Sequence, residues 1–282
     1  MTWKRIAVWM VFAVAVGCGG EPALVRQVRE EQLINAIRHA LLESVEAEKS
    51  AVLATTDEES QSLALETQRF ATDINRMRGE LRPLIVADGR PEEIEKLDAF
   101  DSAWAELESV DKRLLALAVA NSNLKAVRLS AHEGAAALDR LVDTLTEMQR
   151  TTSDPETIRT LSRASVAALR VQSLVMVHIP AADDAEMTRL EQQMHGLSDE
   201  VDHSLAGARE SSQLSPDQLA TASQAWSDYR RVIADVLRLS RENTNVISFD
   251  VSVHEKRHTT RDCLSALSAL LNAVETRSQA TR

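Results

Sequence analysis

The sequence predicts an all-α protein made of two tandem antiparallel four-helix bundles. Aliphatic and small side chains supply most of its apolar content, because hydrophobic residues make up 44% of the chain and aromatic residues only 3%. Glycine and proline are rare after the first twenty residues, so few positions punctuate strands. Apolar residues recur instead at spacings of three and four, which is the period of an amphipathic helix. These observations favour helical bundles over any sheet.

The chain also contains an internal repeat. A shift of 122 residues aligns the run 104–145 with the run 226–267 without a gap. Identical residues then coincide along both runs, among them Trp104 with Trp226, Asn121 with Asn243, Asn123 with Asn245, and His132-Glu133 with His254-Glu255. Similarity of this length indicates one duplicated folding unit. We therefore expect one bundle in residues 18–152 and a second in residues 153–282.

The N-terminus has the pattern of an export signal. Lys4 and Arg5 precede an uncharged run at 6–16, which is too short to span a bilayer and fits a secretory signal. The run ends at Ala15-Val16-Gly17-Cys18, which resembles the signal peptide of bacterial lipoproteins. This resemblance implies that residues 1–17 are removed and that Cys18 becomes the lipidated first residue. A non-lipidated signal peptide or a short membrane anchor is the alternative, because Ala15 stands where the family more often has leucine.

Charge and cysteine content narrow the possible partners. The formal net charge is −11, and removal of Lys4 and Arg5 with the signal changes it to −13. An acidic surface of this size repels nucleic acid, so no nucleic-acid partner is expected. Membrane attachment would then come from acyl chains rather than from basic patches. Once Cys18 is lipidated, Cys263 has no partner for a disulfide, and its apolar neighbours predict a core position.

Turn and cap residues divide the chain at nearly regular intervals. Two overlapping capping boxes begin at Thr55 and Thr56, and the paired asparagines at 121–123 and 243–245 suit helix ends. Prolines at the first helical turn mark further starts. The expected helices are 21–54, 57–87, 91–120, 123–150, 156–178, 181–212, 216–242 and 245–278. One elongated bundle of four helices that run through Thr56, Asn121, His178 and Asn243 is the alternative, and Pro180 argues against it.

Two acidic residues interrupt the apolar stripes that are predicted to form the core. In the first helix the apolar series places Glu48 inward, and in the third helix it does the same for Asp111. One hypothesis is that both form an acidic layer which binds a cationic ligand with help from Arg128. The structural alternative is an internal salt bridge to Lys49, Arg113 or Lys125, or a side chain that reaches out to solvent.

The first hairpin and the paired asparagines carry a resemblance to a known family. The run 48–60 is similar to the first hairpin of the four-helix-bundle sensor domain of methyl-accepting chemotaxis proteins. Trp104 through Leu107, Leu114 through Ala118, and Asn121-x-Asn123 resemble the third helix, the turn and the start of the fourth helix in that family. The resemblance implies a ligand-sensing module outside the cytoplasm and makes a homodimer plausible. We expect no transmembrane helix after Asp250 and no signalling domain, so a partner such as a membrane receptor or a histidine kinase would transmit the signal.

The string His254-Glu255-Lys256-Arg257-His258 matches the His-Glu-x-x-His pattern of zinc hydrolases. The repeat weakens this interpretation, because Ala136 stands where the first copy would need its second imidazole. Helix geometry weakens it further, since His254 and His258 lie off the predicted packing face of the last helix. That face comprises Phe249, Val253, Thr260, Leu264, Leu267 and Leu271. We expect no enzyme activity and no cofactor, and we keep His254 and His258 only as a weak surface metal candidate.

The sequence as a whole therefore predicts an exported, lipid-anchored module that faces the periplasm or the cell exterior. Its expected function is sensory binding of a small molecule. The alternative is a structural or adaptor lipoprotein that recruits a protein partner through its helical surfaces.

Overall fold

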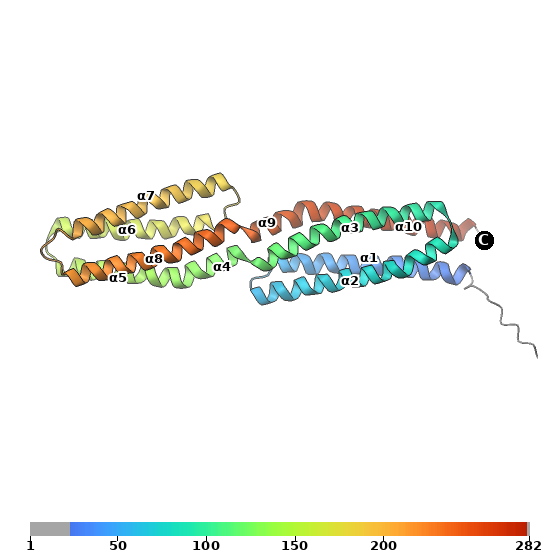
Figure 1. Ribbon diagram of the computed structural model, residues 1–282, viewed down its shortest axis with the longest axis horizontal. Coiled ribbons are helices and arrows are strands. Elements are labelled where there is room, and N and C mark those ends of the chain that lie inside the picture. The colour runs from blue at the N-terminus through green and yellow to red at the C-terminus, as the bar shows by residue number, and fades with distance from the viewer. Residues whose placement is uncertain (1–22, 281–282) are drawn as a thin grey trace, which may run out of the picture.

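A computed structural model describes residues 23–280, and the described part of the chain is a long rod of helices without strands (Figure 1). The all-α fold class is thereby confirmed. The helices are α1 (Ala23–Leu53), α2 (Asp57–Asp88), α3 (Pro91–Ala120), α4 (Ser122–Leu129), α5 (Ala135–Thr151), α6 (Pro155–His178), α7 (Asp184–Ala208), α8 (Pro216–Glu242), α9 (Thr244–Val251) and α10 (Arg257–Ala280). Two π-helical turns, η1 (Ser130–Gly134) and η2 (Ser252–Lys256), interrupt α4–α5 and α9–α10 at equivalent positions of the repeat.

Two four-helix bundles stand end to end along the rod (Figure 1). The first bundle consists of α1, α2, α3 and the α9–η2–α10 helix, and buried aliphatic residues from these helices share one core with Phe100 and Trp104. The second consists of the α4–η1–α5 helix with α6, α7 and α8, around a core that includes Trp226 and Tyr229. Trp104 and Trp226, which occupy equivalent positions of the repeat, are both core residues.

The predicted division at residue 152 is wrong, because the fourth helix of each copy packs in the bundle of the other copy. The fourth helix of the first copy (α4–η1–α5) packs against α6 and α8 of the second copy, and the fourth helix of the second copy (α9–η2–α10) packs against α1 and α3. The second bundle is therefore the continuous segment 122–242, which is inserted between α3 and α9. A division at residue 152 requires the chain to reverse at Asn121 and at Asn243. A single residue separates the helices at each position, and the chain continues along the rod (Figure 1).

Local sequence explains the helix ends. The Thr56 hydroxyl accepts a hydrogen bond from the Glu59 amide at 3.1 Å and caps α2, as the capping box predicted. Asn121 and Asn243 both adopt left-handed backbone conformations, with φ of 50° and 51°, which asparagine tolerates better than most residues. Turns that reverse the chain follow α1 and α6. The alternative of four uninterrupted long helices is therefore excluded at Thr56 and His178.

At the crossover between the bundles, equivalent residues of the two copies bind each other. The Asn123 amide nitrogen of the backbone donates to Asn245 Oδ1 at 3.1 Å, and the Asn245 backbone nitrogen donates to Asn123 Oδ1 at the same distance. Ser122 and Thr244 form a second reciprocal pair through their backbone nitrogens and hydroxyls. These four hydrogen bonds make a local two-fold arrangement. The duplication inferred from sequence is therefore also a contact in space.

Candidate functional site

A layer of charged residues lies within the core of the first bundle. Lys256 of η2 is only 1% exposed and its ammonium group pairs with Asp111 of α3. Glu48 of α1 is fully buried beside them, near Ser252 of η2. Burial raises the pKa of Glu48, while the nearby Lys256 and Ser252 oppose the rise. Burial likewise raises the pKa of Asp111, against the effect of Lys256.

The predicted acidic layer is therefore real, but it contains its own cation. Glu48 and Asp111 both lie inward, as the apolar spacing predicted. Asp111 pairs with Lys256 rather than with any of the basic residues considered from the sequence. Arg128 does not join this layer, because it lies on α4 of the second bundle and pairs with Asp57 at 3.0 Å. The structure thus brings together two of the three predicted ligand-binding residues.

Sequence reasoning missed Lys256 because the packing face of the last helix was misplaced. Phe249 and Val253 are 52% and 38% exposed, so they do not belong to the core. The buried stripe instead passes through Cys263, Leu267 and Leu270, each fully buried. Seven residues before Cys263, at two helical turns, this stripe reaches Lys256. That extension of the cysteine stripe was the signal in the sequence that identifies the buried lysine.

Two surface grooves flank the charged layer. A groove of about 420 Å³ lies between α1 and the α9–η2–α10 helix. It is lined by Val45, Lys49, Val52, Leu53, Phe249, Ser252, Val253, Lys256, Arg257 and Thr260. A second groove of about 530 Å³ lies between α2 and α3, and Asp111 is part of its lining. The Asp111–Lys256 pair therefore connects two openings across the bundle.

The groove beside α1, which we call the cationic groove, is suited to an anion. Lys49 and Arg257 are exposed at its edge and Lys256 lies deeper, whereas no carboxylate among the described residues lines it. The Thr260 hydroxyl is buried there without a hydrogen-bond partner in the described structure. Apolar side chains form the remaining walls. This combination of apolar walls and a few convergent polar groups is typical of small-molecule sites.

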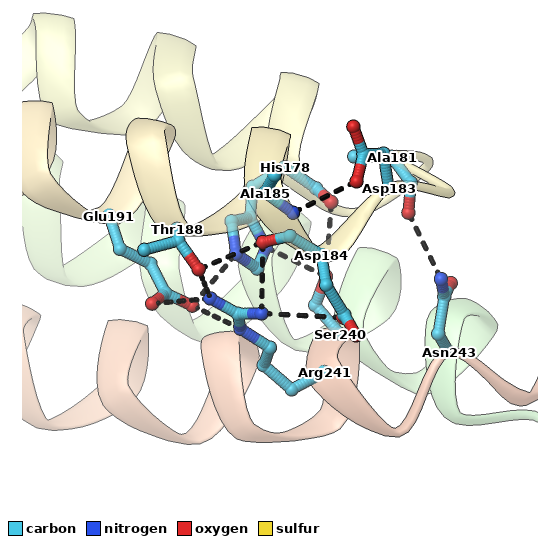
Figure 2. A network of polar contacts seen from close by, with 10 residues as sticks. All are labelled: His178, Ala181, Asp183, Asp184, Ala185, Thr188, Glu191, Ser240, Arg241 and Asn243. Atoms are coloured by element: carbon cyan, nitrogen blue, oxygen red, sulfur yellow. Dashed lines mark hydrogen bonds and ion pairs between the residues drawn. The ribbon is translucent and has the colours of Figure 1, made fainter.

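The second bundle has no counterpart of this layer, because Gly134 stands at the repeat position of Lys256. It has a different polar network, centred on His178, where α6 ends (Figure 2). The ring bonds Ser240 Oγ and Glu191 Oε1 at 2.9 and 3.0 Å. Arg241 binds both oxygens of Glu191, at 2.7 and 2.8 Å. This network was not identified from the sequence, since its members lie on three separate helices.

The structure places the weak metal candidate at the surface of the last helix. His254 and His258 are each 71% exposed, as the helical spacing predicted. His254 pairs backward along the helix with Asp250 at 3.0 Å, and His258 lies 3.6 Å from Asp262, further along the helix. The two rings therefore orient apart. Within residues 23–280, no cluster of three or more histidine, cysteine or acidic side chains has a metal-binding arrangement.

Two further sequence predictions concern the free cysteine and membrane-spanning helices. Cys263 is a free, fully buried thiol, and burial raises its pKa to about 12. At neutral pH such a thiol stays protonated and unreactive. None of the helices in residues 23–280 has both the length and the apolar character needed to cross a bilayer. Cys18 lies outside the described residues.

Comparison with known proteins supports the fold. No family model matches the chain, and no curated protein matches it either. Among solved structures, the chain is similar to the sensor domain of the histidine kinase TorS from V. parahaemolyticus, with a TM-score of 0.52 and 12% sequence identity. The match covers 92% of this chain and 99% of that sensor domain. The chain thus has the fold of a bacterial helical sensor domain, as its resemblance to such domains suggested.

Proposed function

We propose that this protein is a lipid-anchored sensory module that binds a small carboxylate outside the cytoplasm. Support for the sensory role comes from the fold, which matches a histidine kinase sensor domain over nearly the full length of both chains. Support for the anchor comes from the lipoprotein-like sequence that ends at Cys18. The module acts by binding rather than by catalysis. A membrane receptor or histidine kinase would carry the signal inward.

The observation that carries the ligand assignment is the buried lysine of the cationic groove. Lys256 has a single hydrogen bond among the described residues, to Asp111, although an ammonium group can donate three. Lys49 and Arg257 add two positive charges at the edge of the groove. The carboxylate of a ligand can accept hydrogen bonds from these groups, and its apolar tail can pack against the walls formed by Val45 and Phe249. In this account, Glu48 and Asp111 hold Lys256 in place.

A thermal-shift screen of organic acids, amino acids and amines tests this proposal. We expect short carboxylates with apolar tails to raise the melting temperature of the purified protein, while the corresponding neutral amides do not. A ligand at ~100 times its Kd would add about 2.7 kcal/mol to the free energy of unfolding.

Variants of the two charged residues at the edge of the cationic groove distinguish specific ligand binding from general salt effects. Lys49→Gln with Arg257→Gln should remove the ligand-induced shift and leave the melting temperature of the free protein nearly unchanged, because both side chains are exposed. The matched control is Lys112→Gln, which changes a lysine in the groove between α2 and α3. A carboxylate screen without any shift, or a shift that persists in the double variant, would contradict the proposal.

One surface feature favours the adaptor function as a second candidate. Four apolar side chains of α6, namely Val166, Leu169, Met176 and Val177, are between 45% and 56% exposed. Substituting Leu169 and Val177 by serine would weaken recruitment of a protein partner if this face were an interface. Ligand-induced stabilisation through the cationic groove would not change.

A further inference from the structure

His178 combines complete burial with a position that joins three helices. Its side chain is fully buried at the end of α6. One ring nitrogen faces Ser240 of α8 and the other faces Glu191 of α7 (Figure 2). A buried histidine in such a position links the charge of its ring to the packing of the helices around it.

The hydrogen bonds around the ring can be satisfied in two ways. Ser240 has one hydroxyl proton, and its oxygen lies 2.9 Å from His178 Nδ1 and 3.2 Å from the His178 carbonyl oxygen. With a neutral ring, Nε2–H donates to Glu191 and Nδ1 accepts the Ser240 proton. With a charged ring, Nδ1–H donates to Ser240, whose proton then turns to the carbonyl oxygen. The charge of the ring therefore decides which bond Ser240 makes.

The turn that follows His178 is attached to the crossover. Asn123 donates its side-chain amide to the Ile179 carbonyl at 2.7 Å, and Asn243 donates to the Ala181 carbonyl at 3.0 Å. Figure 2 shows the second of these bonds. Ser240 of α8 lies only three residues before Asn243, which follows the end of that helix. Any shift of the α6–α7 turn relative to α8 therefore acts on the residues that connect the two bundles.

The charges around the ring are Glu191 from α7 and Arg241 from α8, and Asp184 of α7 lies behind Arg241. Burial lowers the pKa of His178, and Arg241 adds to this effect, while Glu191 opposes it. The folded chain thus favours the neutral ring. Its stabilising effect is complete above the ordinary pKa of histidine, near 6.5, and is lost as the pH falls below that value.

We propose that His178 is a pH-sensitive latch, which holds the α6–α7 turn against α8 when its ring is neutral and loosens this end of the second bundle when the ring is protonated. The latch acts on the crossover through Asn123 and Asn243, so acidification changes how firmly the two bundles are joined. It operates whether or not the cationic groove binds a ligand.

Melting curves of the full chain at a series of pH values from 5 to 8 test the latch. His178→Gln removes the titrating group while the amide retains hydrogen-bonding capacity. On acidification from pH 7.5 to pH 5.5, the wild type should lose about 2–4 °C more than this variant. If His178 had only a structural role, the variant would melt lower by the same amount at every pH, and the proposal would be overturned.

Two further measurements keep the test decisive. Glu191→Gln removes the anion that faces the ring, so the acid-induced loss should persist or deepen. If acid stabilised the wild type and this variant abolished that gain, a charged His178–Glu191 pair would be the stable state, and the latch would be wrong. The NMR titration of the wild-type ring, assigned with His178→Gln or His178→Asn, should give a pKa below 6.5, and a value at or above 6.5 would also overturn it.

Discussion

Lys256 is the residue on which the candidate site depends, because it is the cation inside an otherwise acidic layer. Replacing it by methionine keeps most of its volume but leaves Asp111 and Glu48 buried without a counter-charge. We expect Lys256→Met to lower the free energy of unfolding by about 3–5 kcal/mol in urea denaturation. The double variant with Asp111→Leu should recover part of this loss, since removing both partners of a buried pair costs less than removing one. Equal losses in the single and double variants would exclude a buried pair.

Glu48 gives a prediction with a definite pH dependence. Its pKa is raised in the folded chain, so the folded state favours the protonated acid and stability falls as the pH rises through the folded-state pKa. Glu48→Gln removes the buried charge and should stabilise the protein at pH 8 by on the order of 1 kcal/mol. The gain should vanish near pH 4, where the wild-type acid is itself protonated. Urea denaturation at both pH values checks this, and a gain that is independent of pH would contradict it.

At the scale of the element, Asn121 and Asn243 determine how the chain passes from one bundle to the other. Asn121 has a φ of 50°, which glycine adopts freely and alanine does not. We expect Asn121→Ala to be less stable than Asn121→Gly by about 1–2 kcal/mol, since both variants lose the same side-chain hydrogen bond. The pair Asn243→Ala and Asn243→Gly is a matched control at the equivalent position. Chemical denaturation of the four variants tests the conformation, and equal stability of the alanine and glycine forms would argue against it.

The helix ends and the buried faces of the helices were predictable, because residues close in sequence determine them. The Thr56 cap, the left-handed asparagines and the inward positions of Glu48 and Asp111 follow from residues close in sequence. The path of the chain after Asn121 was not predictable, since a one-residue break allows either a reversal or a continuation. Lys256 was missed for a related reason. The π-helical turn η2, which ends at Lys256, shifts the phase of the buried stripe, so a regular helical spacing extended back from Leu264 passes through the exposed Phe249 and Val253 instead of Lys256.

At the scale of the whole molecule, the exchange of fourth helices predicts how fragments behave. Residues 122–242 contain every helix of the second bundle, so this fragment should fold alone and melt cooperatively by circular dichroism. Residues 18–152 lack α10, which covers the core formed by α1, α2 and α3. This fragment should be a poorly folded monomer or should associate with a second copy. Cooperative melting of residues 18–152 as a monomer would contradict the exchange.

The proposed anchor also belongs to this scale. If Cys18 carries the lipid, Cys18→Ser should move the protein from the membrane fraction to the soluble fraction of the cell envelope, while its fold stays unchanged. Fractionation with an antibody against the protein measures this. Because the change does not touch residues 23–280, the melting temperature of the purified protein should stay the same. Retention of the serine variant in the membrane fraction would indicate another mode of attachment.

The proposed sensory function is tested most directly by calorimetric titration of the purified protein with the best carboxylate from the thermal-shift screen. We expect one binding site per chain and loss of the binding heat when Lys49 and Arg257 are both changed to glutamine. Two equivalent sites per chain, or undiminished binding by the double variant, would contradict a single site in the cationic groove.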